Sequence, residues 1–146
     1  MTHIVSTVDI SASPTRVWAI LTDFAAYPLW NPFIRSLVGG QRPGGRLRVT
    51  AQPEGGSPMS FKPTLLVFDP ERELRWKGRL GLPGLFDGEH YFELAEPAPG
   101  RVRLIHGERF SGLLVPVVFR GAMRQGIERG FNAMNQALKR RAEAGD

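Results

Sequence analysis

The spacing of hydrophobic and polar residues changes twice along the chain and divides it into three regions. Residues 3–10 alternate between apolar and polar side chains, a period typical of a strand. A helical spacing follows, and it begins at Ser13 and Pro14, residue types favoured at a helix N-cap and first turn. Asp23 is placed to cap a second short helix, which we expect Pro28 to end. The first region therefore predicts a strand followed by two short helices.

The second region consists of short segments with a period of two residues, separated by Gly-rich and Pro-rich turns. Six segments are predicted strands: 33–40, 45–52, 59–68, 73–80, 85–94 and 101–110. Because a short turn joins each strand to the next, an antiparallel meander is the expected topology. The first strand of the chain can then pair beside the last.

The final thirty residues predict one long helix over residues 117–141. Its apolar stripe consists of Phe119, Met123, Ile127, Phe131, Met134 and Leu138. A second stripe of small residues includes Gly126 and Gly130, each of which costs about 1 kcal/mol in a helix relative to alanine. Either the helix backbone approaches another element closely at these glycines, or they leave unfilled volume for a ligand. The apolar faces of helix and sheet must bury each other, so we expect one domain over residues 1–146.

The composition of the 146 residues is that of an ordinary globular protein, with 42% hydrophobic and 23% charged residues. The absence of cysteine excludes disulfides, thiolate metal sites and cysteine nucleophiles. The N-terminal residues do not have the pattern of a signal peptide, and no apolar run is long enough to span a bilayer. We therefore expect a cytoplasmic protein without integral membrane association.

The formal net charge of +5 raises the question of a nucleic-acid partner. The predicted strand 85–94 is acidic on its outer face, and the strands before and after it are basic there. Cross-strand pairs of opposite charge would account for many of the basic residues. Aromatic residues do not alternate with basic ones on a common exposed face, as single-strand binders require. No nucleic-acid partner is expected.

Polar residues on the inner face of the last two strands are the candidates for chemistry. If the hairpin turns through residues 97–100, Phe92 faces His106 and His90 faces Glu108. A buried carboxylate must be paired, hydrogen-bonded or neutral. His90 and Glu108 could satisfy each other, anchor a ligand, or act as a general acid–base pair. No spacing motif supports a metal site, a phosphate loop or a nucleophile elbow, so no metal or cofactor is expected.

Several stretches together resemble a known superfamily over the whole chain. They are "VDISASPTRVWAILTDFAAYPLWNPFI", "FKPTLLVFDPERELRWKGRL", "GEHYFEL" and "HGERFSGLLVP". The sequence is similar to the polyketide cyclase/dehydrase-like branch of the START and birch-pollen-allergen-like (SRPBCC) superfamily. The resemblance implies an α+β helix-grip fold, in which a seven-stranded antiparallel sheet wraps around the long C-terminal helix and encloses a hydrophobic pocket. Relatives bind lipids, sterols, polyketides, quinones and plant hormones, and a minority are enzymes.

The aromatic residues at 22–33 would close one end of that pocket. We expect Phe24 and Trp18 to pack mainly in the core, and Tyr27, Trp30 and Phe33 to form pocket wall. The expected ligand-binding residues are Tyr27, Trp30, Phe33, Trp76, His90, Phe92, His106, Glu108, Phe110, Met123, Ile127 and Phe131.

Three functions are compatible with the sequence. The first is a carrier or sensor that binds a small hydrophobic molecule, such as a lipid, a polyketide or another aromatic or isoprenoid-like compound. The second is a cyclase- or dehydratase-like enzyme that uses His90 and Glu108. The third is an interaction module with little cavity, whose apolar loops at 81–86 and 111–117 contact a protein partner that the sequence does not identify.

Overall fold

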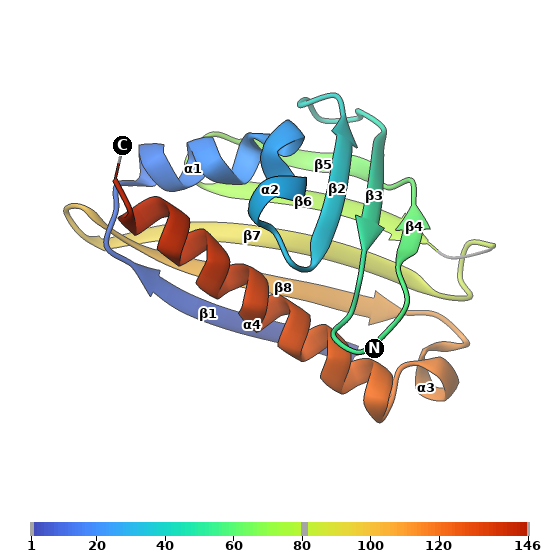
Figure 1. Cartoon of the computed structure of the whole chain (residues 1–146). Coiled ribbons are helices and arrows are strands. Elements are labelled where there is room, and N and C mark those ends of the chain that lie inside the picture. Colours follow the sequence, from blue (N-terminus) through green and yellow to red (C-terminus); the bar gives the residue numbers. More distant parts are fainter. Residues whose placement is uncertain (1, 80–81, 146) are drawn as a thin grey trace.

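Eight strands and five helical segments form the described part of the computed structural model, which covers residues 2–79 and 82–145. The strands are β1 (Thr2–Ile10), β2 (Ile34–Gly39), β3 (Leu47–Ala51), β4 (Met59–Phe61), β5 (Thr64–Asp69), β6 (Glu73–Arg79), β7 (Asp87–Ala98) and β8 (Arg101–Ser111). The helical segments are α1 (Pro14–Thr22), the 3-10 turn η1 (Phe24–Ala26), α2 (Tyr27–Trp30), α3 (Val115–Val118) and α4 (Ala122–Glu143). Helix α4 lies across one face of the curved sheets, as the helix-grip fold requires (Figure 1).

The strands form an antiparallel meander divided into two sheets. One sheet has the order β1-β8-β7-β6-β5 and the other β2-β3-β4, so the predicted single seven-stranded sheet is in fact five plus three strands. The division falls in the predicted strand 59–68, where Pro63, which has no N–H to donate to a ladder, lies between β4 and β5. The isolated bridge between Arg46 and Thr64 still links the sheets. Leu80, the last residue of the predicted strand 73–80, lies outside the described residues.

The register of the last hairpin is the one predicted from the sequence. His90 is the cross-strand partner of Glu108, and Phe92 is the partner of His106. Strand β1 pairs with β8 along its whole length, from Thr2 opposite Phe110 to Ile10 opposite Val102. The first strand therefore lies beside the last, and β8 lies between β1 and β7 in the sheet.

The C-terminal helix differs from the prediction at its start. Instead of one helix over 117–141, the short α3 is separated from α4 by residues 119–121. Gly121 has a φ of 58°, a left-handed conformation that a helix cannot contain. Phe119 continued the apolar stripe in sequence, but its ring is buried against Phe110 at a centroid distance of 4.2 Å, outside the helix.

The segment between β1 and β2 is held by local caps. The Ser13 hydroxyl oxygen accepts a hydrogen bond from the Arg16 N–H at 3.1 Å, which confirms the predicted N-cap. Pro28 does not end a helix as predicted but lies in the first turn of α2, where its missing N–H costs nothing. The Asn31 side-chain oxygen then accepts hydrogen bonds from the N–H groups of Phe33 and Ile34, which turns the chain into β2.

The two glycines in α4 mark close approaches of the helix backbone, the first of the two explanations left open by the sequence. A Cβ atom at Gly130 would overlap the ring of Phe33, and one at Gly126 would lie 2.9 Å from the backbone oxygen of Glu54. The Glu54 N–H also donates a hydrogen bond to the Gly126 carbonyl at 3.2 Å. The glycines therefore let Phe33, just before β2, and the β3–β4 loop pack directly on the helix.

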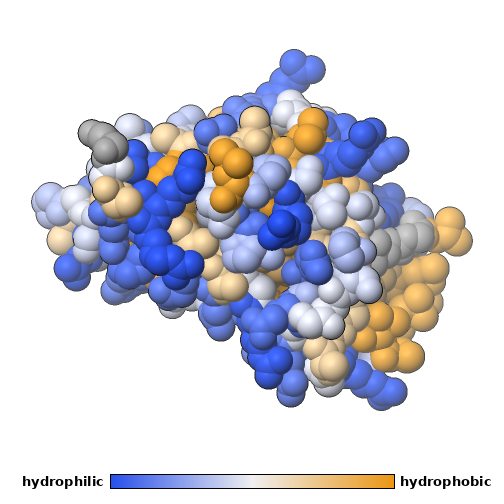
Figure 2. Space-filling model, viewed as in Figure 1, coloured by the Kyte–Doolittle hydropathy of each residue, from blue (hydrophilic) through white to orange (hydrophobic). Residues whose placement is uncertain are grey.

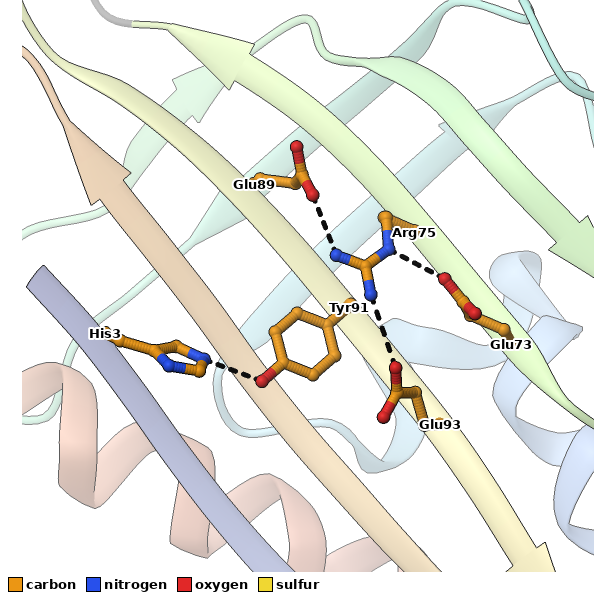
Figure 3. Close-up of polar contacts among 6 residues, drawn as sticks. All are labelled: His3, Glu73, Arg75, Glu89, Tyr91 and Glu93. Atoms are coloured by element: carbon orange, nitrogen blue, oxygen red, sulfur yellow. Dashed lines mark hydrogen bonds and ion pairs between the residues drawn. The ribbon is translucent and has the colours of Figure 1, made fainter. Parts of the chain in front are cut away.

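A compact polar network covers the outer face of the large sheet (Figure 3). Arg75 forms ion pairs with Glu73 and Glu89 at 2.7 Å and with Glu93 at 3.3 Å. Its guanidinium also lies 4.5 Å from the ring centroid of Tyr91, whose hydroxyl group is hydrogen-bonded to a ring nitrogen of His3 at 2.7 Å. The predicted cross-strand charge pairing is confirmed around Arg75.

Apolar side chains gather on the surface around α3 (Figure 2). The exposed ones in this region are Leu82, Leu113, Leu114, Val117 and Val118. Backbone hydrogen bonds from Leu113 to Gly84 and from Leu114 to Leu85 hold the two loops side by side. None of the helices in residues 2–79 and 82–145 is long and apolar enough to cross a membrane.

We expect Gly130→Ala to lower the free energy of unfolding by about 1–3 kcal/mol, because overpacking against Phe33 outweighs the gain of about 1 kcal/mol in helix propensity. Chemical denaturation measures the change. Truncating the opposing ring in the double variant Gly130→Ala/Phe33→Leu should recover part of the loss. A Gly130→Ala variant more stable than the wild type would show that the backbone does not approach closely at this residue.

Candidate functional site

A narrow apolar cavity lies between α4 and the two sheets. The volume that the centre of a water molecule could occupy within it is about 60 Å³. The small sheet contributes residues of β2, β3 and β4, the large sheet contributes β6, β7 and β8, and Met123 and Ile127 project from α4. The polar side chains in the wall are His90, Glu108 and Arg79. The wall is therefore largely apolar, with few polar groups that could orient a bound molecule.

The Glu108 carboxyl group is held in the cavity wall by its neighbours on β7. Its side chain is 13% exposed, and its Oε1 lies 3.0 Å from Nδ1 of His90. A Cβ atom at Gly88 would lie 2.5 Å from Glu108 Oε2, so the glycine leaves the space that this oxygen occupies. The His90 ring stacks on Trp76 at a centroid distance of 5.0 Å and an angle of 11°. Packing thus fixes both side chains.

Glu108 is the first member of a chain of hydrogen bonds through the core. From His90, Nε2 lies 2.7 Å from Nε2 of His106, and His106 Nδ1 lies 2.9 Å from the side-chain oxygen of Asn135 on α4. The Asn135 amide donates to the Ser6 hydroxyl oxygen on β1 at 3.1 Å. We call Glu108, His90, His106, Asn135 and Ser6 the buried polar chain. It connects the cavity with the opposite side of the core.

The environment of His106 keeps its imidazole neutral. The side chain is fully buried and stacks on Phe131 at a centroid distance of 4.0 Å. Burial, followed by repulsion from His90, holds the pKa of His106 well below its ordinary value. A neutral imidazole carries one proton, so one ring nitrogen donates and the other accepts.

The orientation of the Asn135 amide, with its oxygen towards His106, sets where the protons of the buried polar chain lie. The Asn135 side-chain oxygen can only accept, so His106 Nδ1 carries the proton and His106 Nε2 is an acceptor. His90 Nε2–H must then donate to it. The remaining bond, between His90 Nδ1 and Glu108 Oε1, contains one shared proton, either on an imidazolium facing a carboxylate or on a carboxylic acid facing an imidazole. In both states Glu108 Oε2 is a hydrogen-bond acceptor.

Seven of the twelve predicted ligand-binding residues lie in the cavity wall. They are Phe33, Trp76, His90, Glu108, Phe110, Met123 and Ile127. Phe92, His106 and Phe131 pack in the core beside the cavity rather than in its wall. Tyr27 is also a core residue, because its ring is buried and its hydroxyl group donates to the Leu21 carbonyl. Trp30 lies elsewhere, in a surface groove between α1, α2 and the end of α4.

The sequence did not identify the remaining wall residues. These are Ile34, Val49, Ala51, Met59, Phe61, Gly78, Arg79, Phe86 and Gly88. It also missed Asn135, although a signal was present: this residue lies four positions after Phe131 and three before Leu138, on the apolar side of the helix. A polar residue within such a stripe indicates a buried hydrogen-bond partner.

The fold and the cavity between sheets and helix define a helix-grip protein of the START-like class. The chain belongs to the family described as polyketide cyclase / dehydrase and lipid transport, whose sequence model matches residues 1–143. Membership supports a ligand-binding or cyclase role. Comparison with curated proteins gives no match.

Similar solved structures share the fold at low sequence identity. A START superfamily protein from Mycobacterium smegmatis is 23% identical, with a TM-score of 0.74 and 97% of each chain covered. The Zhui aromatase/cyclase from a Streptomyces species is 18% identical, with a TM-score of 0.73 over 97% of this chain and 93% of that one. A protein from Thermus thermophilus is 17% identical, with a TM-score of 0.76 and 98% of each chain covered. At these identities the similarity shows the fold alone.

We expect the free energy of unfolding to decrease as the pH is lowered below about 6.5, and part of this decrease to depend on His106. The unfolded state binds a proton that the folded state excludes, so this group alone lowers the free energy of unfolding by up to about 1.4 kcal/mol per pH unit. Denaturant titrations between pH 7 and 5 measure the slope. The variant His106→Gln should show a shallower slope, whereas His3→Gln, on the outer face, should change it less. An unchanged slope in His106→Gln would contradict the buried neutral state.

Proposed function

We propose that the protein binds a small hydrophobic molecule with a hydroxyl group in the cavity, as a carrier or sensor. One observation carries the proposal: Glu108 Oε1 is bound by His90, while Oε2 accepts no hydrogen bond from the described part of the chain. This oxygen is still accessible from the cavity, and covering it with a ligand is costly unless the ligand supplies a hydrogen-bond partner. A ligand hydroxyl group would supply that partner.

The apolar wall sets the shape of the ligand we expect. Trp76, Phe110 and Phe33 offer aromatic surfaces, and the narrow cavity favours a flat molecule over a bulky one. Met59 and Met123 are flexible side chains that could move to accommodate a larger ligand. Because Oε2 is an acceptor in either state of the shared proton, a hydrogen-bond donor should be preferred over a carboxylate.

The alternative of a cyclase- or dehydratase-like enzyme stays a prediction. The shared proton of His90 and Glu108 gives this pair the groups of a general acid–base catalyst, next to the space where a ligand would lie. His106 and Asn135 do not reach the cavity wall, and would act only by positioning His90. Binding is the common requirement of both roles, so it is tested first.

A matched pair of two-ring probes tests the polar anchor. We expect 2-naphthol to bind about tenfold more tightly than 2-methoxynaphthalene, which has the same rings but no donor. A hydrogen bond contributes about 1 kcal/mol with a neutral acceptor and about 1.5–3 kcal/mol with a charged one. Calorimetric titration measures both affinities. In Glu108→Leu the ratio of the two affinities should fall to about one, because the acceptor is lost.

The variant Glu96→Gln is the control, since it removes an exposed carboxylate at the far end of β7. It should retain the wild-type preference for 2-naphthol. Equal affinities for the two probes in the wild type, or a preference that survives in Glu108→Leu, would contradict the proposed anchor.

A further inference from the structure

A strongly basic hollow lies on the outer side of the molecule, where β3, β4 and β6 meet. Its wall contains five cationic side chains, Arg46, Arg48, Lys62, Lys77 and Arg79. The hydroxyl groups of Ser60 and Thr64 lie among them, and about 440 Å³ is open to the centres of water-sized atoms. No acidic side chain lines this hollow in the described part of the chain.

Strand register explains why these cations gather. Thr64 is the cross-strand partner of Lys77 and also forms the bridge with Arg46, so three neighbouring segments present these residues side by side. Alternation along the strands then places Arg48 beside Arg46, and Arg79 beside Lys77, on the same face. Five like charges on one concave face create a positive potential that attracts anions.

The carboxylates that the sequence suggested as partners are engaged elsewhere. Glu89 lies opposite Lys77, but its carboxylate pairs with Arg75 at 2.7 Å. Asp87 lies opposite Arg79, but accepts hydrogen bonds from the Gly84 N–H at 3.3 Å. Within residues 2–79 and 82–145, none of the five cations of the hollow forms an ion pair. The expectation that cross-strand pairing accounts for the basic residues is therefore wrong for Lys77 and Arg79.

The hollow and the cavity share a thin wall. Phe61, Gly78 and Arg79 line both. A Cβ atom at Gly78 would lie 3.1 Å from Pro63 and 3.3 Å from the Phe61 ring, so Gly78 and these apolar side chains pack between the two spaces, and Arg79 borders both. The pairing of β5 with β6 begins at Thr64 opposite Lys77, and Gly78 and Arg79 pair only with β7. Within residues 2–79 and 82–145, no backbone ladder closes the wall at this place.

We infer that the hollow binds the phosphate group of a ligand whose apolar part occupies the cavity. The inference rests on the proposed function, and it adds the class of ligand: a phosphate ester of a small hydrophobic molecule. The positive charge of the hollow attracts a phosphate dianion, whose oxygens can accept from guanidinium, ammonium and hydroxyl donors at once. A nucleic acid fits less well, because the half-buried Phe61 is the single aromatic residue in this wall.

Octyl phosphate and octanol are the matched probes. We expect octyl phosphate to bind the wild type at least tenfold more tightly than octanol in calorimetric titrations at 50 mM NaCl. Raising NaCl to 500 mM should weaken octyl phosphate binding at least fivefold and leave octanol unchanged, since salt screens exposed charges. The triple variant Arg46→Gln/Lys77→Gln/Arg79→Gln should lose the preference for the phosphate.

The triple variant Arg35→Gln/Arg72→Gln/Arg101→Gln is the control, since it removes the same charge from exposed residues outside the hollow. It should keep the preference for octyl phosphate. The inference is overturned if octyl phosphate binds no more tightly than octanol, or if both triple variants lose the preference equally. Tighter binding of a single-stranded RNA oligomer than of octyl phosphate would also overturn it.

Inorganic pyrophosphate separates this inference from the proposed function. If neither octyl probe binds but pyrophosphate shifts the amide resonances of Thr64 and Lys77, the hollow is an anion site, and the inference of one ligand in both spaces fails. If pyrophosphate shifts neither resonance, the anion site fails as well. The proposed function stands or fails separately, with the binding of 2-naphthol. Vesicles of phosphatidylglycerol identify the source of the phosphate: sedimentation of the wild type but not of the hollow variant assigns it to a lipid headgroup, and no sedimentation assigns it to a phosphate ester in solution.

Discussion

The buried polar chain is the constraint on which the rest of the structure depends. A polar side chain inside the core is tolerated only when a partner satisfies it. Hydrogen bonds connect such partners across four elements. They join His90 on β7 to His106 on β8, then to Asn135 on α4 and Ser6 on β1. A change in strand register, or a rotation of α4, would leave at least one of these side chains without a hydrogen-bond partner. The buried polar chain therefore favours one packing of the helix on the sheet. Apolar contacts alone would specify that packing less strictly.

The buried polar chain also provides two polar groups of the cavity wall, His90 and Glu108. All of its members except Glu108 find their partners within the protein, and Glu108 keeps one oxygen for the cavity. The neighbouring wall lies where β4 and β6 do not pair, and there five cations that form no ion pair with any described residue face outward. The ligand that we propose therefore has a hydroxyl group for the acceptor in the cavity wall and a phosphate group for the cations beyond it.

Features that depend on local periodicity could be predicted from the sequence. The meander, the N-cap at Ser13 and the opposition of His90 and Glu108 all follow from a period of two residues and from turn chemistry. Prediction from the sequence failed where the outcome depends on contacts between distant elements. The break at Gly121 and the contact of Gly130 with Phe33 depend on how α4 meets the sheet. The bond between His90 and His106 depends on ring orientation, which no spacing rule contains.

Nitrogen-15 NMR of the imidazole rings tests the central claim, that the chain holds one proton between His90 and Glu108. At pH 7 we expect a neutral His106 ring with its proton on Nδ1 and an unprotonated Nε2, and a His90 ring protonated at Nε2. Addition of 2-naphthol should shift the His90 Nδ1 resonance and leave the His106 tautomer unchanged. A His106 ring that is charged, or that carries its proton on Nε2, would contradict the claim.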